Sequence, residues 1–282
     1  MLIAQITDLH VGFVPGDPDE PNCQRLATVL ATLIDGPNRP DLLMVTGDIA
    51  DNGDEDSYAR AATILARCPF PVYPCLGNHD DRRHFSRYFP QVPFRDGFVH
   101  YTVRLDGLRL IVLDTLEPGR HGGGFCATRA SWLRAQLDAD RDTPTVIVMH
   151  HPPFDAGIAW MSGGVDEPWV RRFKAAIEGH GQLRAIWCGH LHRPIAAAWH
   201  GVTVTVCPAS AAQLALDLRP IDPELPDDRP MIVADPPGYA LHRWQDNQLV
   251  SLFDTAEAHG TLARFDAGLQ PLVRHLAQER GA

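Results

Sequence analysis

Short apolar runs alternate with amphipathic stretches along the first two thirds of the chain, and this alternation restricts the fold more than any other feature. Apolar runs bounded by Gly, Pro or Asp are typical of strands buried on both faces. We expect strands at residues 2–6, 42–46, 72–76, 101–105, 110–113, 146–149, 185–188 and 202–206. Helical patterns lie between them at 22–34, 55–67, 128–138 and 167–178. The alternation predicts an α/β layered core, with a hairpin where Asp106-Gly107 separates two strands.

The pattern changes after residue 210. Residues 218–237 are rich in proline, which predicts an irregular crossing. A second hairpin is expected where Asp246-Asn247 joins 239–244 to 248–252, and the pattern of 261–280 is helical. We therefore divide the chain into a main domain, residues 1–210, and a small C-terminal cap or oligomerisation segment, residues 211–282.

Composition excludes several classes of protein. The 282 residues carry a formal net charge of −10, so a broad basic face for a nucleic-acid duplex is not expected. No apolar run approaches the ~20 residues that a membrane helix needs, and no secretory leader pattern opens the chain. The 6 cysteines are scattered without a CxxC pair, which favours free thiols and a cytoplasmic protein.

Potential metal ligands follow five of the predicted strands. The clusters are Asp8 with His10, Gly47-Asp48, Gly77-Asn78-His79-Asp80, His150-His151, and Gly189-His190-Leu191-His192. Each cluster alone could be a turn, a helix cap or a hydrogen-bonded histidine. In an open α/β sheet, however, ligands bind outside the carboxyl ends of the strands. Five such clusters at strand ends therefore predict one shared site.

The residue types indicate a pair of metal ions. Imidazole and carboxylate ligands suit zinc, iron, manganese or cobalt, and the absence of cysteine argues against a closed structural zinc site. Asp48 stands alone in its cluster and could bridge two ions with its two oxygens. Two ions ~3.5–4 Å apart form a clamp suited to phosphoryl hydrolysis. Such a site would be locally cationic and would attract a small anionic phosphate ester.

The order D-x-H, G-D, G-N-H-D, H-H and G-H-x-H resembles the calcineurin-like metallophosphoesterase superfamily. The forms around Asn78, His150 and His190 resemble its bacterial branch of class III cyclic-nucleotide phosphodiesterases and glycerophosphodiesterases. The resemblance covers residues 1–210 and implies a four-layer αββα sandwich of two mixed sheets flanked by helices. It implies that one metal is held by Asp8, His10, Asp48 and His192, and the other by Asp48, Asn78, His150 and His190. Which metals these are stays open among iron, manganese, zinc and cobalt.

The resemblance also implies an activity. We expect hydrolysis of small phosphodiesters, either glycerophosphodiesters or 3′,5′-cyclic nucleotides, by attack of a metal-bound hydroxide. Asp48 and His79 are the expected catalytic residues, with His79 facing the substrate as general acid or hydrogen-bond donor. The branch also implies a homo-oligomer formed through the C-terminal segment.

Two other functions stay open at this point. A phosphomonoesterase or promiscuous phosphatase would need an added cation, for which Arg82, Arg83 and Arg120 are candidates. A non-catalytic scaffold would have lost ligands, whereas all seven ligand positions are filled. The substrate, the preference between monoesters and diesters, and the oligomeric state are not readable from the pattern.

Three residues near the site keep alternative interpretations. His151 is either structural or in contact with His150 or substrate. Asp114 follows a strand and could accept a hydrogen bond from a ligand imidazole. His121 lies in a glycine-rich loop, where a solvated position is the favoured interpretation. Loops near 11–22, 116–127 and 155–168, with residues from 210 onward, are expected to form the walls around the metals.

Overall fold

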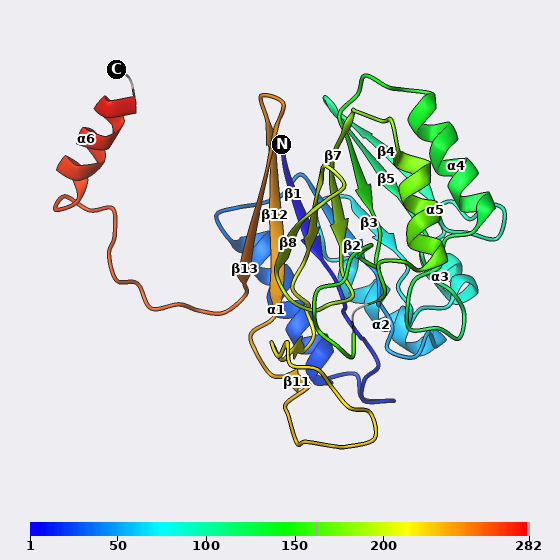
Figure 1. Ribbon diagram of the computed structural model, residues 1–282. Coiled ribbons are helices and arrows are strands. Elements are labelled where there is room, and N and C mark those ends of the chain that lie inside the picture. The colour runs from blue at the N-terminus through cyan, green and yellow to red at the C-terminus, as the bar shows by residue number, and fades with distance from the viewer. Residues whose placement is uncertain (162, 281–282) are drawn as a thin grey trace.

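Two β-sheets packed face to face form the body of the molecule (Figure 1). The computed structural model describes residues 1–161 and 163–280, so residue 162 of the expected wall loop and the last two residues of the C-terminal segment lie outside it. The strands are β1 (Leu2–Ile6), β2 (Leu42–Thr46), β3 (Val72–Cys75), β4 (Tyr101–Leu105), β5 (Leu108–Val112), β6 (Thr145–Val148), β7 (Leu183–Cys188), β8 (Ile195–Trp199), β9 (Val202–Val206), β10 (Gln213–Leu214), β11 (Ile232–Val233), β12 (Gly238–Gln245) and β13 (Gln248–Thr255).

Both large sheets are mixed. The first has the order β13-β12-β1-β2-β3, and the second has the order β4-β5-β6-β7-β9-β8. The helices are α1 (Pro21–Asp35), α2 (Glu55–Leu65), α3 (Arg82–Tyr88), α4 (Ala127–Asp138), α5 (Pro168–Ile177) and α6 (Gln270–Arg280). One hydrophobic core joins α1 and α2 to the first sheet, and another joins α4 and α5 to the second. The expected sandwich of two mixed sheets flanked by helices is confirmed.

Most predicted elements are present with small shifts of their ends. The hairpin at Asp106-Gly107 is formed by β4 and β5. The expected strand ends at 188 and 206 coincide with the ends of β7 and β9. The pattern missed α3 and β8, which are short elements, and the helix expected over 261–280 begins only at Gln270.

The second predicted hairpin, β12 with β13, completes the first sheet. Asp246 and Asn247 connect the two strands with φ angles of 51° and 59°, the left-handed conformation of a tight hairpin turn. Strand β12 pairs antiparallel with β1, so that His242 lies opposite Ile3. Residues 238–255 therefore extend the sheet that carries β1, although the sequence pattern places them in the C-terminal segment.

A buried polar bridge joins the two sheets below the strand ends. Gln5 of β1 donates from Nε2 to the backbone oxygen of Cys188 in β7, at 3.0 Å. His242 is fully buried, and its ring stacks on Trp187 of β7 with 3.8 Å between the ring centroids. Its nitrogens lie 2.9 Å from Gln5 Oε1 and 2.8 Å from Ser251 Oγ. The amide oxygen can only accept, so the neutral imidazole with hydrogen on Nε2 satisfies both contacts.

Acid is expected to destabilise the fold through His242. Burial lowers the pKa of this imidazole to about 3, against ~6.5 for an unfolded histidine. As the pH falls, the unfolded chain therefore binds a proton at this histidine before the folded chain does. The stability that neutral His242 contributes is fully present above ~pH 6.5 and is lost as the pH falls toward 3. At pH 5 the loss is about 2 kcal/mol. Urea unfolding at pH 7.5 and pH 5 should show a smaller difference for His242→Gln than for the wild type; equal differences would contradict the assignment.

No helix within the described residues is long and apolar enough to cross a membrane.

Candidate metal centre

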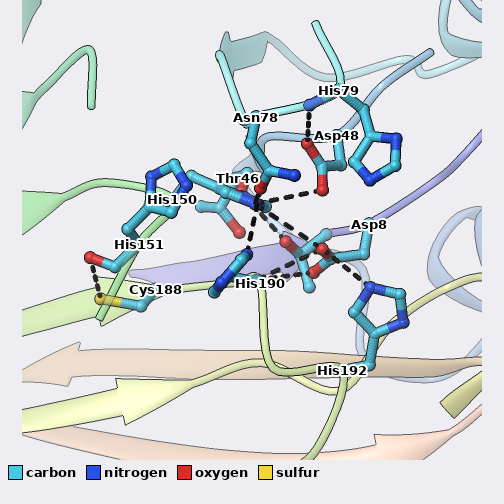
Figure 2. Close-up of polar contacts among 12 residues, drawn as sticks. Asp8, Thr46, Asp48, Asn78, His79, His150, His151, Cys188, His190 and His192 are labelled. Carbon is cyan, nitrogen blue, oxygen red and sulfur yellow. Dashed lines mark hydrogen bonds and ion pairs between the residues drawn. The ribbon is translucent and has the colours of Figure 1, made fainter. Parts of the chain in front are cut away.

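The predicted ligands meet at one edge of the sandwich because the strands that carry them run parallel. In the first sheet β1, β2 and β3 are parallel, and in the second β6 and β7 are parallel. The carboxyl ends of these strands therefore lie together, and the loops after them contribute the side chains in question. Figure 2 shows the labelled side chains pointing toward one another: Asp8, Asp48, Asn78, His150, His190 and His192.

The backbone at these positions is in the left-handed region. The φ angles are 52° at Asp8, 44° at His10, 49° at Asp48, 71° at His190 and 50° at His192. Residues with a side chain rarely adopt this conformation, and such strain collects at functional sites. Backbone hydrogen bonds between the loops hold this conformation: the Asp8 NH donates to the Gly47 carbonyl oxygen at 3.0 Å, and the His10 NH donates to the Asp48 carbonyl oxygen at 2.9 Å.

One group of potential metal ligands, called a donor group below, surrounds Asp8. His192 Nε2 lies 3.2 Å from Asp8 Oδ1 and 3.3 Å from His10 Nε2. His10 Nε2 is also 3.8 Å from Asp48 Oδ2. The ligand atoms of Asp8, His10 and His192 lie within 4.8 Å of one another, a spacing that one cation could bridge.

A second group of donors lies on the other side of Asp48. His150 Nε2 is 3.2 Å from both Asp48 Oδ2 and Asn78 Oδ1. His190 Nδ1 is 3.1 Å from the same Asn78 oxygen. The Asp48 carboxylate thus contacts histidines of both groups. All seven residues that the sequence singled out as ligands are brought together.

Backbone oxygens orient the imidazoles. His150 Nδ1–H donates to the Thr46 oxygen at 2.8 Å, and His192 Nδ1–H donates to the Ala212 oxygen at 2.7 Å. These bonds occupy Nδ1 and turn each Nε2 toward the carboxylates, which is the orientation that metal-binding histidines require. His10 Nδ1 lies 3.0 Å from Asp51 Oδ1, which serves the same purpose. No local pattern pointed to Asp51, because only the packing of two loops brings it to His10.

The electrostatics show a buried site that prefers bound positive charge. Burial raises the pKa of the Asp48 carboxyl, but His150 and His10 outweigh this effect, so the pKa lies well below its usual range. Burial lowers the pKa of His150, but Asp48 and Asp8 raise it to about 9. Burial keeps the pKa of His190 well below the usual histidine value.

The donor set fits two cations. Asp8 and Asp48 are both buried carboxylates, and two like charges at this depth need positive charge beside them. The imidazoles, carboxylates and amide oxygen are ligands for first-row transition metals. Among the sets of side chains whose ligand atoms lie close enough to hold one ion, two contain Asp8 and two contain Asp48, as expected for two neighbouring ions.

Asp80 holds the loop after β3 against the loop after β2. Its carboxylate accepts hydrogen bonds from Gly77 N at 2.8 Å, Ile49 N at 3.1 Å and Ala50 N at 3.2 Å, and from the Tyr58 hydroxyl at 2.7 Å. Glycine is required at position 77, where the two loops come close together, because a Cβ there would overlap Asp48 Oδ1. Burial and the nearby Asp48 raise the pKa of Asp80 to about 6.

His79 stands beside the donor groups. Its backbone NH donates to Asp48 Oδ1 at 2.9 Å, and its ring lies 4.7 Å from the His10 ring, edge to face. The ring Nδ1 is 2.7 Å from the backbone oxygen of Asp51, so Nδ1 carries the hydrogen. This contact turns Nε2 away from the Asp51 backbone.

The interpretation of Asp114 as a partner of a ligand imidazole is wrong. Arg82 forms a bidentate pair with it at 2.7 and 2.8 Å, and the carboxylate also accepts from Val99 N and Leu116 N at 3.0 Å. A fully buried carboxylate needs such compensation, and Arg82 supplies it. Arg82 is consequently engaged away from the metal centre. Arg120 pairs with Glu167, with 3.5 Å between Nη2 and Oε2.

His121 is exposed, as expected, but its ring faces the site. Its centroid lies 4.9 Å from that of His190 and 6.4 Å from that of His79, both edge to face. The glycines around it in 120–124 were the only sequence signal for a loop that could reach the metals. The loop forms one wall of a cavity of about 270 Å³ beside the donor groups. Aromatic side chains line much of that cavity: Phe154, Trp160 and Trp169.

Comparison with known proteins agrees with this geometry. Residues 1–194 match the family model described as calcineurin-like phosphoesterase. The chain is 30% identical over 212 residues to a probable glycerophosphodiester phosphodiesterase of Arcobacter nitrofigilis, covering 74% of this chain and 76% of that protein. It is 32% identical over 260 residues to a probable cyclic nucleotide phosphodiesterase of Rhodopseudomonas palustris, covering 84% and 90%.

The fold is similar to that of a dimetal phosphatase from Danio rerio, with a TM-score of 0.66 and 13% identity over 91% of this chain and 96% of the other. At that identity the likeness concerns the fold alone. The family match covers well over half of the chain and includes all the strand-end clusters. The chain belongs to the calcineurin-like phosphoesterase family.

Proposed function

We propose that this protein hydrolyses small phosphodiesters with two transition-metal ions. The observation that carries the proposal is the position of the Asp48 carboxylate between two groups of buried donors. The names of the relatives support glycerophosphodiesters and cyclic nucleotides as the substrate classes. The net charge of −10 argues against a nucleic-acid duplex as substrate.

The proposed ligands divide into two sets that share Asp48. Asp8, His10, Asp48 and His192 would hold one metal, and Asp48, Asn78, His150 and His190 would hold the other. When bound, such a pair activates water near neutral pH and neutralises charge on the phosphoryl oxygens. The Thr46, Ala212 and Asp51 contacts keep the imidazoles turned toward these positions, so the chain supplies a site organised in advance.

His79 is proposed to act on the substrate and not on the metals. Its Nδ1–H donates to the Asp51 oxygen, so the imidazolium form, which carries a second hydrogen on Nε2, would donate that hydrogen to a phosphoryl oxygen or to the departing alcohol. A diester leaves as a poor alkoxide, so a proton or hydrogen bond delivered there lowers the barrier. The backbone bond to Asp48 keeps the ring next to the reacting groups.

Replacing His79 with alanine is expected to lower kcat by about 10²-fold, the usual contribution of a positioned acid or donor. Metal content should stay at the wild-type value, because no ligand is removed. Elemental analysis and steady-state rates on bis-aryl phosphate measure both quantities. Loss of metal from the variant would show that His79 is a ligand.

A panel of substrates tests the proposed activity. Cyclic AMP, glycerophosphocholine, glycerophosphoethanolamine, a bis-aryl and a mono-aryl phosphate are compared with manganese, iron, zinc or cobalt supplied. We expect diesters to react faster than monoesters, because two of the three candidate cations for the extra monoester charge, Arg82 and Arg120, are engaged with carboxylates, which leaves Arg83. Faster monoester hydrolysis would favour a phosphatase, and absence of both activity and metal would favour a scaffold.

Free thiols support a cytoplasmic location. All six cysteines are unpaired, and Cys23, Cys75, Cys188 and Cys207 are buried. Unpaired cysteines persist in reducing compartments. We propose this location on that ground.

We also propose that the C-terminal segment forms a contact between two copies of the chain. Figure 1 shows α6 standing apart from the sheets, and none of its residues is buried. Leu272, Val273 and Leu276 lie on one exposed apolar face of α6, and Leu252 is exposed on β13, the edge strand of the first sheet. The same stretch of chain thus carries an unpaired strand edge and an apolar helix that a second copy would cover together.

The molar mass in solution tests this contact. We expect light scattering to report a dimer or larger for the wild type and a monomer for Leu272→Glu combined with Leu276→Glu. Gln278→Glu on the same helix is the matched control and should keep the wild-type mass. A monomeric wild type would contradict the proposal.

A further inference from the structure

His151 lies among the metal-binding side chains but is bonded differently from them. Its ring is 4.8 Å from the ring of His150 and 4.7 Å from that of His190, and a nitrogen of each lies within 4.8 Å of the others. By distance alone it would count as a third ligand of that group. The contact that Figure 2 draws for it is that of its backbone oxygen with the sulfur of Cys188.

Both ring nitrogens of His151 are used within the chain. Nε2 is 3.2 Å from the backbone oxygen of His121, and a carbonyl oxygen only accepts, so Nε2 carries the hydrogen. Nδ1 is then the acceptor, and the Thr115 hydroxyl donates to it at 2.8 Å. Neither nitrogen has a lone pair left for a cation.

The bond to His121 attaches the glycine-rich loop 120–124 to the strand end. Gly124 N also donates to the Thr115 oxygen at 2.8 Å, next to the hydroxyl that holds His151. Gly123 lies so close that a Cβ there would be 3.0 Å from the His151 side chain. The loop is therefore held against His151 at adjacent points. This attachment places the His121 ring 4.9 Å from that of His190, in the lining of the 270 Å³ cavity.

We propose that His151 is a positioning residue that fixes loop 120–124, so that His121 stands over the metal centre on the side from which the substrate enters. His121 then donates a hydrogen bond to the phosphoryl group or to the departing alcohol, and His151 acts only through it. The role of His121 rests on the proposed function, whereas the attachment of the loop does not.

The two amide replacements of His151 separate positioning from metal binding. The glutamine nitrogen reaches the position of Nε2 and retains a donor for the His121 oxygen, whereas asparagine reaches only as far as Nδ1. We expect His151→Asn to lower kcat/KM on a bis-aryl phosphate by about 10²-fold, because small displacements of a substrate-facing group have effects of this size. His151→Gln should stay within about tenfold of the wild type. Both variants should hold as much metal as the wild-type holoenzyme.

A double-mutant cycle tests whether His151 acts through His121. We expect His121→Ala to lower kcat/KM as much as His151→Asn, and the double variant to fall no further. If the kcat/KM losses of the two single variants multiplied in the double variant, His151 and His121 would have independent roles. Loss of metal from His151→Asn would show that His151 is a metal ligand. Wild-type activity in His121→Ala would show that His121 does not contact the reacting groups. Each of these results overturns the proposal.

A thiol-labelling assay tests the attachment without any activity. Cys126 lies two residues after the loop and is partly exposed, and Cys68 is a partly exposed cysteine elsewhere. We expect maleimide to label Cys126 several-fold faster in His151→Asn and in Thr115→Val than in the wild type, with His151→Gln, Thr115→Ser and the Cys68 rate unchanged. Unchanged Cys126 labelling in both loosened variants overturns the attachment. If the wild type had no diesterase activity but these labelling differences were seen, the proposed function would be contradicted and the attachment of the loop would stand.

Discussion

Replacing Asp48 with alanine is expected to lower diesterase activity by more than about 10³-fold, equivalent to about 4 kcal/mol in the activation barrier. The Asp48 carboxylate contacts histidines of both donor groups, at 3.2 Å from His150 and 3.8 Å from His10. Its removal takes one ligand from each proposed metal and leaves the histidines of two sites without a common anion. We therefore expect metal content to fall from about two ions per chain to below one, by elemental analysis.

Asp51→Asn is the matched control for this prediction. Asp51 lies in the same loop region and bonds His10 Nδ1 at 3.0 Å, but it is not among the proposed ligands. Changes of this kind lower metal affinity or activity by about 10- to 100-fold, less than loss of the shared ligand. An Asp48→Ala variant that kept two ions and most of its activity would contradict the proposed ligand sets.

Replacing Asp80 with alanine is expected to lower the free energy of unfolding by about 3–5 kcal/mol. The carboxylate accepts hydrogen bonds from the backbone NH groups of Gly77, Ile49 and Ala50 and from the hydroxyl of Tyr58, all in the interior. Alanine leaves the three backbone donors without a partner and leaves the Tyr58 hydroxyl only its 3.5 Å contact with the Asp81 oxygen, and each unsatisfied buried donor costs ~1–3 kcal/mol when it cannot relax. The loops that carry Asp48 and Asn78 lose these bonds in the same step and keep only the one from His79 N to Asp48 Oδ1 among those described above.

Urea unfolding of the wild type, Asp80→Ala and Asp80→Asn measures this effect. Asparagine retains one oxygen acceptor in the same place, so it should lose less than half as much stability as alanine. Asp56→Ala, at an exposed position of α2, should be near neutral. Equal stability of Asp80→Ala and the wild type would mean that the two loops do not depend on this carboxylate.

Local pattern was sufficient for most elements and for the ligand list. The apolar runs at β1, β2, β6 and β7 mark buried parallel strands, and the polar residues directly after them must lie at the same edge of their sheet. For this reason Asp8, Asp48 and His150 could be named as neighbours although they are far apart in the chain. The hairpin turn at Asp246-Asn247 was predicted on the same local basis, since both residues tolerate a positive φ.

Short elements and long-range partners were not predictable in this way. Helix α3 has only seven residues and depends on Asp81 at its N-terminus, which accepts from Arg83 N and His84 N. Arg82 lies in the first turn of that helix and pairs with Asp114, which follows β5 of the second sheet, so neither partner carries a local signal. The interpretation of Asp114 as a partner of an imidazole failed because Arg82 is the stronger partner for a buried carboxylate.

The local sequence pattern therefore determined which side chains follow the strands. Those side chain types in turn determined which metal ions suit the site. The arrangement in space was settled by the packing of one sheet against the other, because the two donor groups draw on both sheets and meet only when the sandwich closes. Asp51 beside His10, Asp80 between two loops and His151 under loop 120–124 are products of that packing. Each is selected by a distance in the folded molecule, which periodicity along the chain does not encode.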